Sequence, residues 1–134
     1  MKKDKTKELR YKKTISFLSK YCNQKKKVLD LGTPNELSAL MKKSGYNVTN
    51  TKGENLDVDF NAVMDDSIEI VTAFEIFEHM LAPFNILKKI KSKKLVASVP
   101  LKLWFANAYW NTNDEWDRHY HEFEIKQFNF LLKN

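Results

Sequence analysis

The sequence is poor in several residue types, beginning with cysteine. It contains one cysteine, Cys22, so an internal disulfide is excluded and a reducing compartment is indicated. No apolar run approaches the ~20 residues that span a bilayer, and the lysine-rich N-terminus lacks the apolar core of an export signal. We therefore expect a cytoplasmic protein that does not enter the membrane.

Arginine is also scarce, although the formal net charge is +6. Only Arg10 and Arg118 among the 23 basic residues are arginines, the residue best suited to two-point contacts with phosphates and bases. The lysines are scattered along the chain, which is more typical of a solvated surface than of a nucleic-acid groove. We therefore do not expect a nucleic-acid partner.

What the sequence does contain is enough apolar material for a core. Hydrophobic residues make up 43% and aromatic residues 13% of the 134 residues, which suits one compact domain. We expect a single domain over residues 1–134. Its parts are an N-terminal helix in residues 1–24, an α/β core in residues 25–100, and an aromatic segment with a final helix in residues 101–134.

Hydrophobic residues recur at helical spacing in four places. Tyr11, Ile15, Leu18 and Cys22 fall three or four residues apart, which predicts a helix over residues 6–22. The same kind of spacing, with suitable start and stop residues, predicts three further helices. These contain Leu37, Leu40 and Met41, ended by Gly45; Phe84, Leu87 and Ile90, begun by Pro83; and Ile125, Phe128 and Leu132.

Short β-prone segments alternate with these helices. The longest, residues 67–77, is expected to be a central strand. Strands that alternate with helices over short loops form a mainly parallel, doubly wound α/β sheet with helices on both faces. We therefore predict a Rossmann-like domain with about five strands, at residues 28–31, 46–51, 55–60, 67–77 and 94–100.

The turn after the first predicted strand has only one glycine, Gly32, where a cofactor loop usually has several. Thr33 as N-cap, Pro34 as first helical residue and Glu36 as reciprocal partner predict a capping box instead. The first helical donors would then be engaged and a negative charge added, so a phosphate is disfavoured. A helix that caps itself and binds no ligand stays open as an alternative.

The order of these segments resembles the class I S-adenosylmethionine-dependent methyltransferases from about residue 12 to the end of the chain. "VLDLG" (28–32) is similar to the first motif of the family, "VTAFEIFEHMLAPFNIL" (71–87) to its fourth-strand motif and "KKLVASVP" (93–100) to its fifth strand. "HYHEFEIKQFNFLL" (119–132) resembles the His-x-His/Phe segment and helix of members that act on small molecules. Each motif alone has low specificity, but their common order and spacing point to one family.

The resemblance implies that S-adenosylmethionine binds at the carboxyl ends of the strands, which is also where a doubly wound sheet places its ligands. Asp30 and Gly32 would border the methionine portion, and the glycine would let the backbone approach the ligand. Thr33 is also expected to bind the cofactor. The other implied contacts are Glu54 with the ribose, Asp59 and Phe60 with the adenine, and Phe74 and Glu75 at the end of the fourth-strand motif.

The sequence departs from the family at positions that matter for the cofactor. Pro34 and Glu36 stand where the family has loop glycines. Lys52 stands where the family has the acid that binds the ribose hydroxyls, so Glu54 would have to take the place of that acid. Two hypotheses follow. The first is a methyltransferase that acts on a small molecule or a cell-envelope precursor; the second is a catalytically inactive, methyltransferase-like domain that binds a partner.

Three histidines are the candidate catalytic bases. They are His79, His119 and His121, chosen because an unperturbed histidine side chain titrates near neutral pH and methyl transfer requires removal of a proton from the acceptor. A role for His79 as a residue that only bonds the backbone at the start of a helix stays open. No metal site is expected, because zinc needs three or four ligands and Cys22 is distant in sequence. The acids of the loop, Asp114, Glu115 and Asp117, are interpreted as solvated.

The sequence leaves open what the aromatic segment 101–123 packs against and what covers the strand before it. The aromatic residues of the segment would form either a lid over the acceptor pocket or a satellite of the core. The sheet of the family usually continues into a final hairpin, which would begin where the sequence stops at Asn134. Either the natural protein continues, or the strand at 94–99 is an apolar edge that has to be covered. We expect self-association, in a possible homodimer, to cover this edge; the alternative cover is segment 101–123. The aromatic residues are Trp104, Phe105, Tyr109, Trp110 and Trp116.

Overall fold

Four parallel strands form the sheet of the protein in the computed structural model, which describes residues 2–134, with side chains from residue 5 onward. The spatial order of the strands is β2-β1-β3-β4, so β1 and β3 lie in the interior and the order reverses around β1. All three neighbouring pairs are parallel. The strands are β1 (Lys27–Asp30), β2 (Asn47–Asn50), β3 (Ile70–Phe74) and β4 (Lys94–Ser98).

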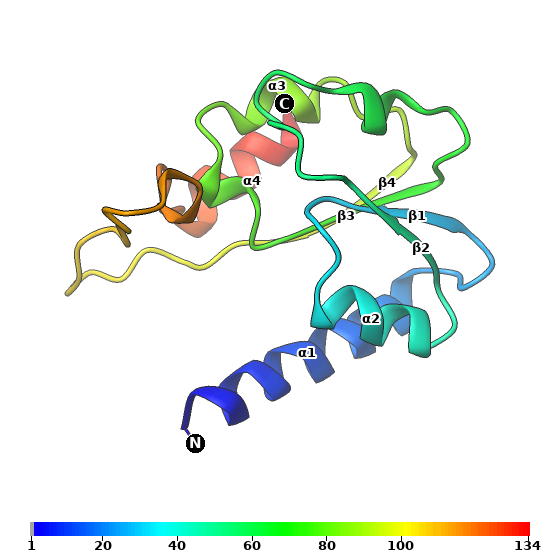
Figure 1. The fold of residues 1–134 in the computed structure, drawn as a ribbon, viewed down its shortest axis with the longest axis horizontal. Coiled ribbons are helices and arrows are strands. Elements are labelled where there is room, and N and C mark those ends of the chain that lie inside the picture. The colour runs from blue at the N-terminus through cyan, green and yellow to red at the C-terminus, as the bar shows by residue number, and fades with distance from the viewer. Residues whose placement is uncertain (1) are drawn as a thin grey trace.

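Helices cover both faces of this sheet. Figure 1 shows α1 (Lys2–Tyr21) and α2 (Glu36–Lys43) on one face and α3 (Pro83–Leu87) and α4 (Ile125–Lys133) on the other. Two separate core clusters result, because alternate side chains of a strand point to opposite faces. The predicted α/β class, with a parallel sheet and helices on both faces, is confirmed.

The predicted strand at residues 55–60 is wrong, and the described residues form four strands instead of five. The segment is a turn in which the backbone oxygen of Asn55 accepts hydrogen bonds from the amides of Val58 and Asp59. The side chain of Asn55 also accepts from the amide of Asp57, an Asx turn that competes with extended pairing. Val58, in the middle of the predicted strand, is 72% exposed.

The capping box predicted for Thr33 and Glu36 is also wrong, although a capping box exists two residues later. Asn35 is the N-cap of α2: its side chain accepts a hydrogen bond of 2.9 Å from the amide of Ser38. The hydroxyl group of Ser38 in turn accepts from the amide of Asn35 at 2.9 Å. Asn35 fits this role because asparagine is at least as good an N-cap as threonine.

The other predicted helix signals hold. Gly45 follows α2 with φ of +97°, and the amides of Gly45 and Tyr46 bond the carbonyls of Lys42 and Met41, which is a Schellman ending. Pro83 occupies the first turn of α3. Among the residues that the structure describes, none of the helices combines the length and the apolarity needed to cross a bilayer.

The segment 101–123 leaves the sheet after β4 and returns before α4. Its two ends are joined by the amide of Lys102, which donates to the carbonyl of Phe123 at 2.9 Å. The five aromatic side chains named for this segment are between 49% and 92% exposed, so the interpretation as a packed satellite of the core is wrong. The lid interpretation stays a prediction.

Candidate functional site

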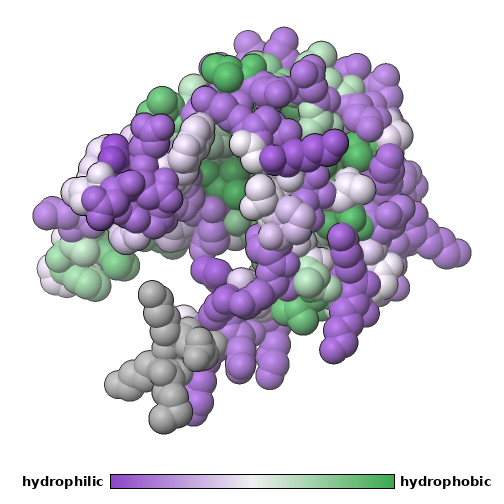
Figure 2. All heavy atoms as spheres, viewed as in Figure 1, coloured by the Kyte–Doolittle hydropathy of each residue, from purple (hydrophilic) through white to green (hydrophobic). Residues whose placement is uncertain are grey.

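A crevice of about 380 Å³ opens at the carboxyl ends of β1 and β3, where the strand order reverses. This is the position at which doubly wound sheets bind their ligands. Figure 2 shows a hollow with hydrophobic side chains on its floor, between the aromatic segment at the left and the rest of the molecule. The crevice is lined by Gly32, Thr33, Gly53, Glu54, Asn55, Leu56, Asp57, Ile76, His79, Met80 and Trp116.

Beneath the crevice lies a buried polar network centred on Asp30. Its Oδ1 atom accepts a hydrogen bond of 2.6 Å from the hydroxyl group of Thr72, and its Oδ2 atom accepts one of 3.0 Å from the side chain of Asn50. Burial raises the pKa of Asp30, and these two hydrogen bonds only partly offset that effect. Asp30 is thus a rigid support below the loop, held by both neighbouring strands.

The loop above Asp30 is held close to the crevice by its backbone. The amide of Gly32 donates to the hydroxyl group of the buried Thr51 at 2.7 Å, and the carbonyl of Gly32 accepts from Asn50 at 3.1 Å. Gly32 has φ of +110°, and an added Cβ would lie 3.2 Å from Cδ1 of Ile76. Because side chains rarely adopt this conformation, glycine is required here, and the backbone itself forms the wall.

The charged residues that line the crevice are acidic. Glu54 and Asp57 contribute carboxylates, whereas none of the described lining residues is lysine or arginine. One oxygen of Glu54 accepts from the amide of Lys52 at 3.0 Å. The oxygens of Asp57 accept from the amides of Leu81 and Ala82 at 3.0 and 2.7 Å. The electrostatics of the crevice therefore favour a cationic ligand over a pyrophosphate.

Five of the residues expected at the cofactor lie outside this lining set: Asp30, which lies beneath the crevice, and the four that follow. Asp59 accepts from the amide of Asn61, and the partly buried Phe60 packs against the core cluster that contains Phe77 and Ile86. Phe74 lines a second cavity, described below. Glu75 has φ of +56° and an ion pair of 3.3 Å with Arg10, and burial raises its pKa. Contacts between these five residues and a ligand stay predictions.

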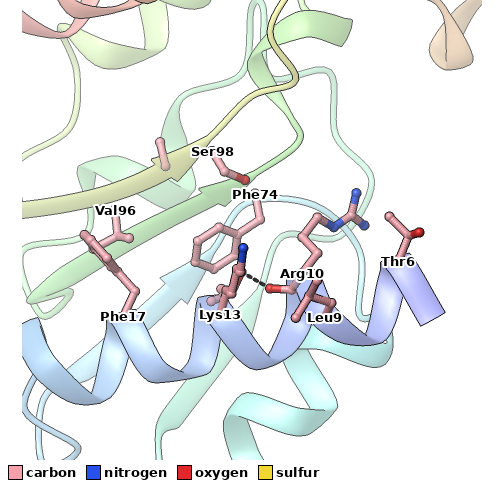
Figure 3. Close-up of a pocket in the computed structure, with 10 residues that line it drawn as sticks. Thr6, Leu9, Arg10, Lys13, Phe17, Phe74, Val96 and Ser98 are labelled. Carbon is pink, nitrogen blue, oxygen red and sulfur yellow. Dashed lines mark hydrogen bonds between the residues drawn. The ribbon is translucent and has the colours of Figure 1, made fainter. Parts of the chain in front are cut away.

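The second cavity, of about 470 Å³, lies between α1 and the edge strand β4. Figure 3 shows Phe17, Phe74 and Val96 turned toward one another across it, with Arg10 and Lys13 along the helix. The surface that it presents is mainly apolar, and the histidine residues lie elsewhere. We therefore locate the chemistry in the crevice and not in this cavity.

The structure brings two of the three candidate histidines together. The rings of His79 and His119 meet edge to face with centroids 4.9 Å apart, whereas the Nε2 atom of His121 bonds the carbonyl of Leu81. His79 lines the crevice, and its Nδ1 atom bonds the carbonyl of Arg118 at 3.0 Å. His79 thus makes the backbone bond of the alternative interpretation, and its role as a catalytic base stays a prediction. Burial is the main cause that lowers the pKa of His79.

Sequence reasoning missed the role of Glu78, which is 1% exposed and lies beside both histidines. Burial raises its pKa to about 8. Glu78, His79 and His119 each offer one ligand atom, and these three atoms lie within 4.8 Å of one another. The expectation of no metal site considered the distant Cys22, not this set of side chains.

Other missed residues had weaker signals in the sequence. Asn50 pairs with Asp30 in the parallel register of β1 and β2, and this could have been found once both strands were assigned. The sequence indicates Trp116 only as part of the possible lid, and the structure places it in the lining of the crevice. In the acidic loop, Asp117 accepts from the side chains of Tyr109 and Asn111, and Asp114 bonds the amide of Trp116.

Comparison with known proteins agrees with this geometry. The sequence model of a family described as a methyltransferase domain matches residues 4–134. No curated protein and no solved structure matches the chain. Members of this family generally use S-adenosylmethionine.

Proposed function

Because the chain belongs to the methyltransferase domain family, we propose that it transfers a methyl group from S-adenosylmethionine to a small molecule or a cell-envelope precursor. When bound, this cofactor supplies a methyl group on a positively charged sulfur. The observation that carries the proposal is the crevice beside Gly32, whose described lining includes two carboxylates and neither lysine nor arginine. Its volume of about 380 Å³ falls in the range of small-molecule sites.

The residues around Gly32 fit the cofactor. The backbone at Gly32 leaves room where a Cβ would contact Ile76, so a ligand can approach the main chain. The Oδ1 atom of Asn50 is buried and makes no hydrogen bond within the described residues, although the same side chain bonds Gly32. A buried acceptor without a partner is costly, and an amino group of the ligand would satisfy it.

Glu54 is the residue that we assign to the ribose hydroxyls. It lines the crevice, and its Oε1 atom already accepts the amide of Lys52, which fixes the side chain. A carboxylate accepts two hydroxyl donors, whereas the lysine at the usual position of the family's acid can only donate. Glu54 thus restores the acceptor that Lys52 removed.

The acceptor side of the crevice is formed by His79 and Trp116, with His119 behind His79. A small acceptor is favoured because both arginine side chains are engaged within the protein. Arg10 pairs with Glu75, and Arg118 donates to backbone carbonyls and lies over Trp110. Base or phosphate recognition by a guanidinium group would require breaking these contacts.

Isothermal titration with S-adenosylmethionine and with its demethylated product tests the proposal. Glu54→Gln should weaken binding about tenfold or more, since a hydrogen bond to a charged group contributes about 1.5–3 kcal/mol. Glu69→Gln is the matched control, because Glu69 pairs with Lys26 at the opposite end of the sheet. NAD serves as a control ligand that carries a pyrophosphate.

Binding of both sulfur compounds, weakened by Glu54→Gln and unchanged by Glu69→Gln, supports the assignment. Absence of heat and of thermal stabilisation at millimolar ligand would overturn it. The chain would then be the inactive binding domain of the alternative hypothesis. Tighter binding of NAD than of S-adenosylmethionine would contradict the electrostatic argument made from Glu54 and Asp57.

A further inference from the structure

The cluster of Glu78, His79 and His119 joins two segments that are far apart in sequence. Glu78 and His79 belong to the 3₁₀-helix Phe77–His79, directly after β3. His119 lies in the returning part of the aromatic segment. The backbone oxygen of Glu78 accepts hydrogen bonds from the amides of Tyr120 and His121, at 2.8 and 3.2 Å. These bonds fix the distance between the two segments and therefore the shape of the cluster.

Both imidazole rings are oriented by a hydrogen bond at Nδ1. In His79 the partner is the carbonyl of Arg118, at 3.0 Å. A carbonyl oxygen can only accept, so Nδ1 carries the hydrogen and Nε2 keeps a free lone pair. This Nε2 atom lies 3.7 Å from Oε1 of Glu78. The ring thus directs a lone pair toward the carboxyl group of Glu78, and an ion between the two groups would be within reach of both.

The ring of His119 is held in a similar way. Its Nδ1 atom bonds Oε1 of Glu122 at 3.2 Å, and the same oxygen accepts from the amide of Tyr109 at 2.9 Å. A histidine whose Nδ1 bonds a carboxylate and whose Nε2 is free is the usual arrangement of a metal-ligating histidine. The partners of both rings are thus those found behind the ligands of metal sites.

Glu78 supplies the independent observation. Its side chain is 1% exposed, and Oε2 makes no hydrogen bond among the residues that the structure describes. A buried carboxylate oxygen without a partner costs several kcal/mol unless a proton or a cation compensates it. A metal ion held between Glu78 and the two imidazoles would supply this compensation, as protonation of the carboxyl group does when no ion is bound.

We propose that Glu78, His79 and His119 bind a divalent transition-metal ion. One carboxylate and two imidazoles are the donor set of mixed nitrogen and oxygen sites, which suit zinc, cobalt or manganese better than magnesium. Three protein ligands leave at least one coordination position open. Since His79 also lines the crevice, a hydroxyl group of the acceptor is the group expected there, and the ion would lower the pKa of that hydroxyl.

The assignment of the open position rests on the proposed function, but metal binding itself does not. It is therefore tested without cofactor and without acceptor. Protein freed of metal with a chelator is titrated with Co²⁺, whose visible absorption reports coordination by nitrogen ligands, and with Zn²⁺ in a calorimeter. We expect one ion per chain.

His119→Gln should weaken binding of both ions at least tenfold. Glu78→Gln should weaken it by the same factor, and it should not destabilise the fold because it removes a buried ionisable group. His121→Gln is the matched control. It lies two residues from His119, but its Nε2 atom bonds Leu81 and its ring stacks on Phe123. Its variant should bind both ions as the wild type does.

A Co²⁺ titration without a saturable spectrum would overturn the proposal, as would equal losses in the His119 and His121 variants. If the His119 variant does not fold, the Glu78 variant decides the question alone. Binding of S-adenosylmethionine by a chain that fails to bind metal would refute the metal site and leave the proposed function standing.

Discussion

The hydroxyl group of Thr72 donates a hydrogen bond of 2.6 Å to Oδ1 of Asp30, and both residues are buried where β3 meets β1. Their positions are partners in the parallel register of the two strands. The contact therefore joins the two interior strands at the point where the crevice opens. It couples the stability of the sheet to the shape of the loop that starts at Leu31.

Replacement Thr72→Val keeps the shape of the side chain and removes the donor. One oxygen of a buried carboxyl group then loses its partner, which costs about 1–3 kcal/mol. We expect the free energy of unfolding, measured in urea, to fall by that amount. Thr49→Val is the control: Thr49 is exposed on β2 with a long bond of 3.4 Å to a carbonyl, so its loss should stay within about 0.5 kcal/mol. Equal losses would contradict the special role of Thr72.

The raised pKa of Asp30 makes stability depend on pH with a definite sign. Its ordinary value is 3.8, and burial raises the pKa in the native state. The native state therefore binds the proton more tightly than the unfolded chain does. The stabilisation is complete below pH 3.8 and is lost as the pH rises through the raised native pKa.

Asp30→Asn should remove this contribution. The difference in free energy of unfolding between the wild type and Asp30→Asn should change in one direction, to the disadvantage of the wild type, as the pH rises above 3.8. Glu75 and Glu78 also have raised pKa values, but they are present in both proteins and cancel in the difference. Urea unfolding over a pH series measures it, and parallel profiles would refute the assignment.

The sheet could be predicted because its signals are local. The β-prone runs and the helical spacings each occupy a few residues, and they located the four strands and the four α-helices of the described chain. The bounds were less accurate: β3 is shorter than the predicted 67–77, and α3 ends at Leu87, before Ile90. The segment 55–60 misled because the alternation of Leu56, Val58 and Phe60 fits a strand, whereas Asn55 fixes a turn through its own side chain. A turn of this kind can override a short alternating pattern.

The site was less predictable because it depends on contacts between distant segments. Gly32, Thr33, Glu54 and His79 were identified from local motifs, and they do line the crevice. The cluster at Glu78 could not be identified in this way. It forms only because the amide of Tyr120 returns to the backbone oxygen of Glu78 after the long aromatic segment.

The corrected N-cap of α2 predicts which residue of the loop stabilises the helix. Asn35→Ala removes the acceptor for the amide of Ser38 and should cost about 1 kcal/mol. Thr33→Ala should leave stability within about 0.5 kcal/mol, because Thr33 is exposed and lies before the cap. Thermal or urea unfolding of both variants measures this. A larger loss at Thr33 than at Asn35 would restore the cap expected from the sequence.

Strand β4 forms one edge of the sheet within the described chain, since it pairs with β3 alone. Beside it lies the apolar cavity of Figure 3, to which the half-exposed Phe17 and Leu9 contribute. An apolar edge with unpaired backbone groups tends to associate. We therefore expect a dimer formed through this edge, as the sequence indicated. Sedimentation velocity over the micromolar range measures it.

A charge placed on this surface should favour the monomer. Phe17→Lys puts an ammonium group at the mouth of the cavity, where burial in a dimer would desolvate it. The dissociation constant should therefore rise about tenfold or more, since a loss of 1.4 kcal/mol corresponds to a factor of ten. Val58→Lys is the control, because Val58 is 72% exposed on the turn at residues 55–60 and not on this edge. A wild-type protein that sediments as a monomer throughout would exclude the dimer, and equal effects of the two lysines would place its interface elsewhere.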